Sequence, residues 1–193
     1  MRKIPAQISE RLPAAAELFA ERGLNDTKIE DVAATTGIAK ATLYYYFAGK
    51  EEILAFLLED VLQHVADEVT AIVEADGTAA QRLHTVINAQ LRVMAQRPAV
   101  CRALIGELGR AARMPAIADM ITTAYFEPVE TLLRAGAADG SLVALDKPRA
   151  AAIALFGAVT ISALTYLITD DALNEELIAR TIHDVAFIGL RPR

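Results

Sequence analysis

Apolar residues recur at helical spacing along almost the whole chain, and no run alternates apolar and polar residues as a strand would. The first apolar stripe predicts a helix over residues 8–22 and is formed by Leu12, Ala15, Ala16 and Phe19. Gly23 follows it, and glycine is the residue that most readily takes the positive φ of a helix end. Pro13 interrupts this helix, so it should kink the first turns or make residue 13 the effective start.

Two short helices and one long helix are predicted next. The second helix begins at Thr27, because Thr27-Lys28-Ile29-Glu30 has the capping-box pattern, in which the hydroxyl caps the third amide and Glu30 reaches back. Gly37 ends this helix and permits a sharp turn into a third helix over residues 39–45. The fourth helix runs from Lys50 to about residue 74 and carries a broad apolar face.

The rest of the chain has the pattern of further helices, separated by proline, glycine and polar residues. Their predicted ranges are 78–96, 98–112, 115–136, 147–169 and 172–189, and Pro128 should kink the third of these. The sequence therefore predicts an all-α protein of about nine helices. We expect a small N-terminal head, residues 1–47, joined by the fourth helix to a helical body, residues 48–193.

Residues 150–168 carry no charge over a length that could span a bilayer. Six of these residues are alanine, and Thr160, Ser162 and Thr165 interrupt the apolar surface. A helix that protein covers on all sides has the same composition. We expect this second arrangement, with no membrane involved, and in a protein of this size it requires a partner subunit.

The content of cysteine and histidine favours a cytoplasmic protein without catalytic chemistry. Cys101 is the single cysteine, so neither an intrachain disulfide nor a cysteine metal site can form. The N-terminus has basic residues but no apolar stretch after them, so a signal peptide is not expected. His64, His84 and His183 lie on separate predicted helices, and no catalytic or phosphate-binding motif occurs. We therefore expect no cofactor, no metal and no enzyme activity.

Charge is distributed unevenly along the chain. The net charge is −6, yet residues 1–50 hold seven Lys and Arg against six Asp and Glu, a net of +1, which leaves −7 on residues 51–193. Only the N-terminal quarter is therefore not repelled by nucleic acid phosphates.

Two short helices joined by a glycine turn and backed by a third helix predict a helix-turn-helix. In the second short helix Leu43 should face inward together with Ile38 and Phe47. The residues left on its outer face are Lys40, Thr42, Tyr44 and Tyr45. A lysine can reach guanine acceptors, and threonine and tyrosine can contact a thymine methyl or a phosphate, so this face suits a DNA groove.

The residues from Leu12 to Leu54 resemble the DNA-binding domain of the TetR family. The most specific part is the signature Thr-Leu-Tyr-x-Tyr-Phe-x-x-Lys-Glu, which begins here at Thr42. The likeness covers about a quarter of the chain. Ala39 stands where the family often has serine, which removes a helix cap worth ~1 kcal/mol, and Pro13 is unusual within the first helix.

The resemblance implies roles for individual residues. Thr27 would contact a phosphate at the start of the second helix, Lys40, Thr42 and Tyr44 would enter the major groove, and Tyr45 and Lys50 would bind phosphates. The complete set of DNA-binding residues implied in this way is Thr27, Lys28, Ala39, Lys40, Ala41, Thr42, Tyr44, Tyr45 and Lys50. Arg2 and Lys3 could form an arm that reaches an adjacent groove, or a solvated tail.

A dimer is expected because two recognition helices about 34 Å apart read a palindromic operator in double-stranded DNA. In TetR-like proteins the last two long helices of each subunit form the interface, and here both helices are broadly apolar. The residues predicted at this homodimer interface are Ile153, Gly157, Ile161, Leu164, Leu177, Ile178, Ile182 and Val185. The alternative is a monomer in which the uncharged helix is simply central.

The family's middle helices usually enclose a pocket for a small molecule. The candidate ligand-binding residues are Leu57, Val61, His64, Leu91, Met94, Leu104, Met120, Tyr125, Phe126, Phe156 and Thr160. Each of them could equally belong to the core. His64 is predicted on the inward half of the fourth helix.

The family resemblance implies a repressor that a small, hydrophobic effector releases from its operator. Effector in the body would pivot the fourth helix, provided that the effector binds the conformation that does not bind DNA more tightly. A TetR-like architectural or partner-binding protein without an effector is the alternative, and the head alone does not decide between repressor and activator.

Overall fold

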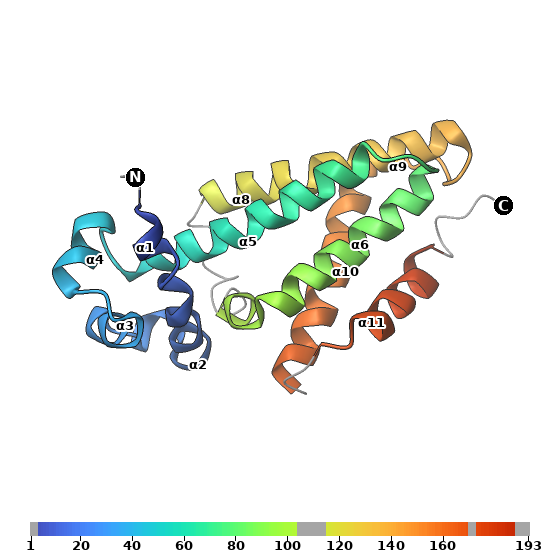
Figure 1. Ribbon diagram of the computed structural model, residues 1–193. Coiled ribbons are helices and arrows are strands. Elements are labelled where there is room, and N and C mark those ends of the chain that lie inside the picture. The colour runs from blue at the N-terminus through green and yellow to red at the C-terminus, as the bar shows by residue number, and fades with distance from the viewer. Residues whose placement is uncertain (1–3, 104–114, 170–172, 188–193) are drawn as a thin grey trace. The chain divides into compact units, whose positions relative to one another are not determined.

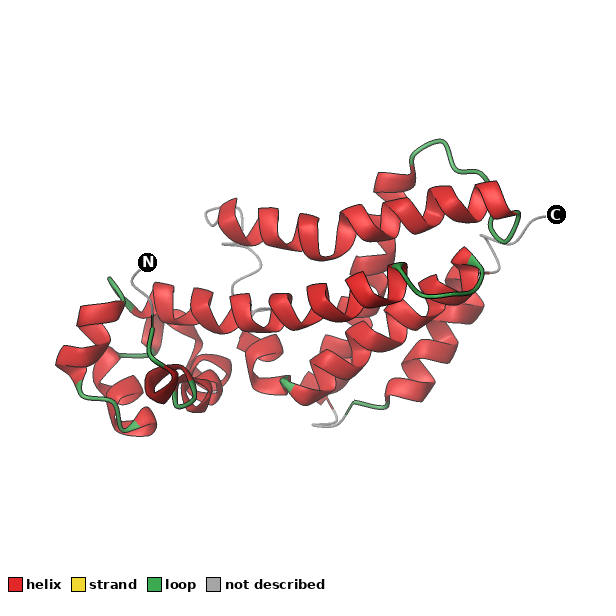
Figure 2. Cartoon of the chain, turned by 45° about the horizontal axis from the view of Figure 1, so that its top comes forward, coloured by secondary structure: helices red, strands yellow, loops and turns green. Residues whose placement is uncertain are grey.

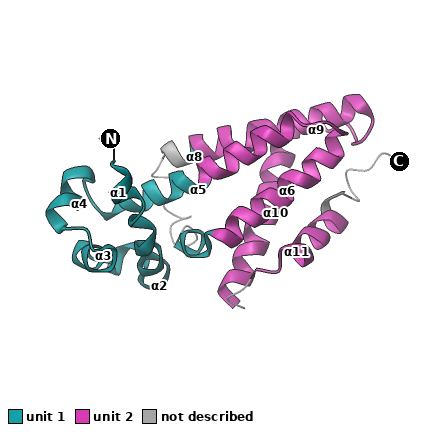
Figure 3. Ribbon diagram, viewed as in Figure 1, with its two compact units in different colours: residues 1–61, 97–118 teal, residues 62–96, 119–193 magenta. Residues whose placement is uncertain are grey.

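The computed structural model describes residues 4–103, 115–169 and 173–187, and every element within these ranges is helical (Figures 1 and 2). The all-α class predicted from the spacing of apolar residues is confirmed. The chain divides into two compact units (Figure 3). Unit 1 comprises residues 1–61 and 97–118, and unit 2 comprises residues 62–96 and 119–193. The predicted boundary after residue 47 lies inside unit 1, and the functional division into head and body stays a prediction.

Unit 1 is built from short helices packed around the first turns of a long one. In chain order they are α1 (Ala6–Ser9), the 3-10 turn η1 (Leu12–Ala15), α2 (Ala16–Asp26), α3 (Ile29–Thr36), α4 (Lys40–Tyr46) and α5 (Lys50–Val73), and residues 98–103 are also helical. The core of this unit is formed by side chains with almost no exposure, namely Leu12, Phe19, Val32, Leu43, Phe47, Ile53 and Leu54.

The single first helix predicted over residues 8–22 is wrong. Pro13 lies in the first turn of the 3-10 segment, where its missing N–H costs nothing, and this segment separates α1 from α2. Gly23 takes a positive φ of 72°, as expected, but α2 continues past it to Asp26 with a kink instead of ending there.

The capping box predicted from Thr27 is also wrong, because α3 begins two residues later. Lys28 is the N-cap residue, and its N–H donates to the Asp31 carboxylate at 3.3 Å. The hydroxyl of Thr27 turns the other way and donates to the carbonyl of Gly23 at 2.7 Å. The kink at Gly23 leaves this carbonyl without a regular helical partner, so the buried hydroxyl satisfies it.

Unit 2 contains the remaining helices. They are α6 (Ala79–Gln96), the π-helical turn η2 (Thr122–Phe126), α9 (Glu127–Asp139), α10 (Pro148–Thr169), α11 (Glu175–Ile182) and the π-helical turn η3 (His183–Phe187). The helix α8 (Pro115–Ile121) begins in unit 1, and only its last residues, from 119 on, belong to unit 2. α6 packs against α9, α10 and α11 and is buried on several faces, so it is the central helix of the unit (Figure 1).

Pro128 disturbs its helix as expected, and the disturbance takes the form of the π-helical turn. Pro128 has no N–H to offer a carbonyl one turn back. The preceding residues widen the turn, so that the N–H of Glu127 reaches the carbonyl of Thr122. The same turn places Tyr125 in the interior of unit 2.

α10 is the one described helix that is long and apolar enough to cross a membrane, and 39% of its most apolar stretch is buried within the chain. Its buried face includes Ala152, Leu155, Val159 and Ala163. The chain alone therefore covers the helix only in part, and its full burial by a partner subunit stays a prediction. One face packs into the core of unit 2 and the opposite face is exposed.

Candidate nucleic-acid interface

α3 and α4 are joined by a tight turn centred on Gly37. Gly37 has a left-handed conformation with φ of 64°, as the sequence predicts. Thr36 holds the turn from the inside, because its buried hydroxyl donates to the carbonyl of Val32 at 2.7 Å and accepts from the N–H of Ile38 at 3.3 Å. Ile38 is itself buried, so the turn has a fixed shape that sets the direction of α4.

α4 presents one apolar and one polar face, as predicted. Leu43 is fully buried, and Phe47, which follows the helix, is 2% exposed. Lys40, Ala41, Tyr44 and Tyr45 are exposed, together with Ala39 just before the helix, and Thr42 is half-buried. Tyr44 and Tyr45 are 53% and 59% exposed, which is unusual for aromatic side chains without a binding role. Their contact with DNA stays a prediction.

Lys40, the predicted base-reading residue, is engaged by an acidic neighbour. Its ammonium forms an ion pair with Glu30 of α3 and lies 5.8 Å from the centre of the Tyr44 ring. The hydrogen bond from Lys40 holds the pKa of the Glu30 carboxyl below its ordinary value, and the same bond raises the pKa of Lys40. Both groups are therefore charged at neutral pH, and Glu30 would compete with DNA for the lysine if Lys40 reads bases as predicted.

Replacing Glu30 with glutamine should raise the affinity for operator DNA several-fold. The change frees the Lys40 ammonium and removes a negative charge from the face that meets phosphates. A filter-binding titration at fixed salt would measure the effect, with Glu74→Gln, directly after the end of α5, as the control for net charge. A fall in affinity would mean that Glu30 holds Lys40 in its reading position.

Lys50 is anchored at the start of α5. Its ammonium donates to the carbonyls of Asn25 at 2.7 Å and Thr27 at 2.8 Å, so two of its three N–H groups hold the start of α5 to the last turn of α2 and to the residue that follows α2. It lies in a cleft of about 320 Å³ whose lining residues are Thr27, Lys28, Ile29, Glu30, Tyr44, Ala48, Gly49, Lys50 and Glu51. The cleft joins the N-terminus of α3 to the exposed face of α4.

The hydroxyl of Thr27 cannot take the phosphate-binding role that the resemblance implies. It is fully buried and donates to main-chain carbonyls of α2. The N-terminus of α3 instead offers the exposed Lys28 and the main-chain N–H groups that follow it. Arg2 and Lys3 lie outside the described residues.

The predicted ligand-binding residues separate into several environments. Leu57 and Val61 are buried in unit 1, whereas Leu91, Met94, Tyr125 and Thr160 are buried in unit 2. Met120, Phe126 and Phe156 are half-buried. His64 is exposed, so its predicted place on the inward half of the helix is wrong, and Leu104 lies outside the described residues.

Three of these candidates form an aromatic cluster in unit 2. The Tyr125 ring lies 5.1 Å from the Phe156 ring and 6.3 Å from the Phe126 ring, and the last two rings are 5.3 Å apart, all edge to face. Arg149 stacks on Phe126 at 5.1 Å. Burial raises the pKa of Tyr125, so its phenol stays protonated at neutral pH.

One buried polar residue of this region was not predicted. Gln90 of α6 is 2% exposed, and its amide Nε2 donates to the Thr160 hydroxyl at 2.8 Å. The sequence does contain a sign of this residue. Gln90 is spaced three or four residues from Val86, Ile87 and Met94, so it lies on an apolar helix face, where a polar side chain requires a hydrogen-bond partner.

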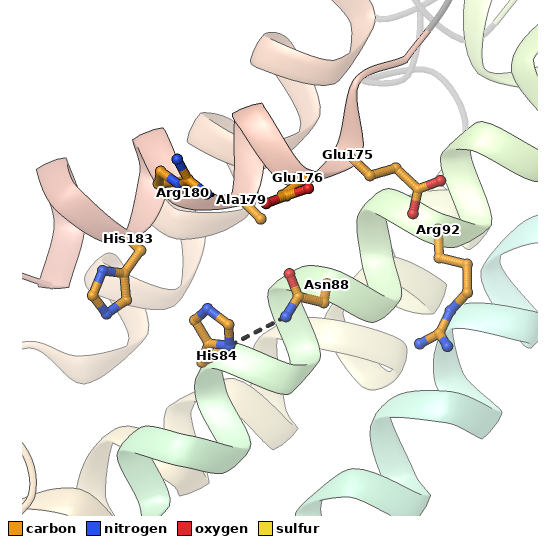
Figure 4. A pocket seen from close by; sticks show the side chains of 8 residues that line it. All are labelled: His84, Asn88, Arg92, Glu175, Glu176, Ala179, Arg180 and His183. Atoms are coloured by element: carbon orange, nitrogen blue, oxygen red, sulfur yellow. Dashed lines mark hydrogen bonds and ion pairs between the residues drawn. The ribbon is translucent and has the colours of Figure 1, made fainter.

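Two histidines meet at a polar cleft between α6 and α11 (Figure 4). The cleft of about 540 Å³ is lined by His84, Asn88, Arg92, Glu175, Glu176, Ala179, Arg180 and His183. The His84 and His183 rings are 5.5 Å apart, and Asn88 is in hydrogen-bond contact with His84 at 3.1 Å. Burial, followed by the charge of His183, lowers the pKa of His84.

Unit 2 should lose stability as the pH falls below the ordinary imidazole pKa of 6.5. Because the folded-state pKa of His84 is lowered, the unfolded chain takes up the proton first, and the stabilisation is lost as the pH falls through the folded-state value. The loss stays below ~1.4 kcal/mol per pH unit, the limit for one proton. Urea unfolding at a series of pH values would measure it.

His84→Gln is the variant that checks this pH dependence, since it should flatten the profile around pH 6. Titration of Asp139 does not affect this comparison of pH profiles. Its carboxylate accepts the N–H of Ala79 at 2.9 Å, and its pKa is lowered by hydrogen bonds from Ser141 and Ala79. Its contribution is therefore lost only at more acidic pH. An unchanged slope in His84→Gln would assign the dependence to another group.

The residues predicted at the dimer interface fall into two groups. Ile153, Ile161, Leu177 and Val185 are exposed, and a Cβ added at Gly157 would meet nothing within 4 Å. Leu164, Ile178 and Ile182 are buried inside the same subunit, so their placement at an interface is wrong. Ile168 of α10, which was not predicted, is 61% exposed. The remaining predicted residues still await a test.

Exposed large apolar side chains gather in two places within the described ranges. One is Tyr44 and Tyr45 on α4, and the other is the series on α10, α11 and η3 formed by Ile153, Ile161, Ile168, Leu177 and Val185. Cys101, the single cysteine, is buried, and burial raises the pKa of its thiol to about 12. Such a thiol is not a reactive thiolate at neutral pH.

The α3–turn–α4 arrangement, with an anchored Leu43 and an exposed polar face, is a helix-turn-helix of the DNA-binding type. Residues 12–56 match the profile described as bacterial regulatory proteins, tetR family. The match places residues 12–56 in the DNA-binding region of the tetR family of bacterial regulatory proteins.

Individual relatives agree with this assignment. The chain is 33% identical over 98 residues to the HTH-type transcriptional repressor KstR2 of Mycobacterium tuberculosis, and this match covers 49% of each chain. The chain thus spans about half the length of that curated relative. The structure of KstR2, titled a ketosteroid transcriptional regulator, has a TM-score of 0.80 with 23% identity, covering 99% of this chain and 98% of that one. FadR from Bacillus subtilis in complex with stearoyl-CoA has a TM-score of 0.79 with 21% identity, covering 95% and 97%. The two structures establish the fold.

Proposed function

We propose that the protein is a dimeric transcription repressor that binds a palindromic operator and is released by a small apolar effector. The observation that carries the proposal is the exposed face of α4. The side chains of Lys40, Tyr44 and Tyr45 are exposed to solvent there, while the side chain of Leu43 is buried and fixes the helix in place. Exposed aromatic rings beside a lysine suit base edges and phosphates, and they have no role in the packing of unit 1.

The dimer is supported by the apolar series on α10 and α11. Five exposed aliphatic side chains in one region of a single unit are more than an isolated subunit normally leaves in water. A two-fold dimer would cover them, and it would also supply the second recognition helix that a palindrome requires.

An apolar effector is supported by the interior of unit 2 and by the relatives. The candidate residues Leu91, Met94, Met120, Tyr125, Phe126, Phe156 and Thr160 belong to this unit. Of the similar structures, one is a ketosteroid transcriptional regulator and the other is a complex with stearoyl-CoA. α5 runs unbroken across the boundary between the units, so it is the covalent path by which a change in unit 2 would reach unit 1. Release requires that the effector prefer the conformation that does not bind DNA.

Selection of bound sequences from a random pool of duplex DNA tests the operator proposal. A recovered palindrome with half-sites about one helical turn apart would support both the dimer and the reading helix. Recovery of no common sequence, or of a single half-site, would contradict it. A thermal-shift screen of apolar metabolites followed by operator release then tests the effector. If no compound binds, the chain acts as a DNA-binding protein without a small-molecule effector.

A further inference from the structure

Unit 2 buries three side-chain polar atoms that have no hydrogen-bond partner within the described part of the chain. One is Nε of Arg82, whose guanidinium already donates through Nη1 to the carbonyl of Val73 at 2.6 Å. The other two are the carbonyl oxygen Oε1 of Gln90 and the phenol oxygen of Tyr125. Both side chains are almost fully buried, at 2% and 1% exposure. A buried polar group without a partner costs folding free energy, so two of them in one region require an explanation other than packing.

The two side chains contact one face of α10. Gln90 reaches this helix through its hydrogen bond to Thr160 at 2.8 Å, and the Tyr125 ring packs on Phe156 at 5.1 Å. Phe156 and Thr160 are four residues apart, which places them one above the other on the same helix face. Three separate elements, α6, η2 and α10, therefore bring an unpaired acceptor and an unpaired donor to adjacent turns.

The surroundings of these atoms are apolar and aromatic. Phe126 adds a second ring against Phe156 at 5.3 Å. Arg149 stacks on Phe126 and donates to the Thr122 hydroxyl at 3.2 Å. Among the described residues, no charged side chain forms a hydrogen bond or a ring contact with Tyr125, Phe156, Gln90 or Thr160. A carboxylate or ammonium buried there would lack a counter-charge and would be strongly disfavoured.

We infer that the effector is an uncharged apolar molecule with one hydroxyl, and that Tyr125 and Gln90 bind this hydroxyl. The inference rests on the proposed effector response and names its chemistry. A hydroxyl that accepts from the phenol O–H of Tyr125 and donates to Oε1 of Gln90 would satisfy both atoms. A keto oxygen would accept from Tyr125 but leave Oε1 of Gln90 unpaired, because both oxygens are acceptors. The rings of Tyr125, Phe126 and Phe156 would contact the apolar body.

Isothermal titration calorimetry on the full chain without DNA tests this assignment. The probes share one apolar body and differ only in the polar group: cyclodecanol, cyclodecanone, cyclodecanecarboxylate and cyclodecane. We expect the alcohol to bind at least about ten-fold more tightly than the carboxylate and the hydrocarbon, because a site with buried hydrogen-bonding groups rejects ligands that leave these groups unpaired or add a charge. The ketone pairs with Tyr125 alone, so it should bind less tightly than the alcohol.

Tyr125→Phe and Gln90→Leu should each weaken cyclodecanol binding about ten-fold and remove its advantage over cyclodecane. Tyr125→Phe should also keep or raise the Tm of the free protein, because it deletes a buried hydroxyl that has no partner. Tyr166→Phe on α10 and Gln96→Leu at the end of α6 are matched controls at less buried positions, and neither should change binding.

Several outcomes would overturn the assignment. They are binding of the carboxylate as tightly as the alcohol, unchanged alcohol binding by Tyr125→Phe, a clear fall in Tm for Tyr125→Phe, and binding of none of the probes. Operator titrations of the same proteins separate this inference from the proposed function. Wild type that binds cyclodecanol but no DNA would contradict the repressor proposal alone, whereas a DNA-binding protein that binds no probe would contradict the inference alone.

Discussion

Replacing Ile161 with glutamate is expected to leave the protein monomeric at micromolar concentration and to lower operator affinity at least about a hundred-fold. Ile161 is 54% exposed and lies in the middle of the apolar series on α10, between Ile153 and Ile168. In a two-fold interface each substitution appears twice, so two carboxylates would lose their water close to the symmetry axis. Without the dimer each head would bind its half-site alone.

Two measurements check the effect of Ile161→Glu. Light scattering coupled to size-exclusion chromatography gives the oligomeric state, and a gel-shift titration with the selected palindrome gives the affinity. Because Ile161 is exposed in the single chain, the helix content and the fold of unit 2 should be kept. Thr131→Glu, at an exposed position of α9, adds the same charge and should change neither result. A dimer that survives Ile161→Glu would place the interface elsewhere.

The residues predicted at the dimer interface also show what helical spacing can predict and what it cannot. The spacing correctly indicated that α10 is apolar on nearly all sides, but it could not say which side is the core. Successive residues are about 100° apart around a helix, so moving from Leu164 to Thr165 turns the face from the interior to solvent. On α11 the same ambiguity placed the buried Ile178 and Ile182 at the interface beside the exposed Leu177.

The helix-turn-helix could be predicted almost completely, because its signals are local. Gly37 requires a left-handed turn, and α4 has a single apolar anchor, Leu43, so one orientation is strongly preferred. The error at Thr27 has a local cause as well. The acidic residues Glu30 and Asp31 allow two capping registers, and the kink at Gly23 decides between them by providing a carbonyl for the Thr27 hydroxyl.

The polar groups inside unit 2 depend on contacts between distant parts of the sequence. Gln90 finds Thr160 seventy residues away, and His84 meets His183 across an even longer interval. No periodicity records such a pairing, since each residue seen alone is only a polar position on an amphipathic helix. The aromatic candidates were predictable as residue types, but their meeting at one face of α10 follows from the packing of η2 against that helix.

Lys40→Ala and Lys50→Ala should impair operator binding in two different ways. Loss of Lys40, which lies beside Tyr44 on the exposed face of α4, should relax the base preference at one position in each half-site, by about 1–3 kcal/mol of discrimination. Loss of Lys50 should weaken binding to all sequences alike, since the third N–H of its ammonium remains for a phosphate at the cleft beside α3.

Salt dependence separates a phosphate contact of Lys50 from a purely structural role. If Lys50 binds one phosphate in each subunit, the slope of log affinity against log salt should become shallower by about 2 for the dimer in Lys50→Ala. Lys50→Ala also removes the ties to the carbonyls of Asn25 and Thr27, so a lower Tm is expected under either role. A weakened variant with an unchanged slope would mean that the ammonium stays on those two carbonyls and acts by positioning α3 beside α5.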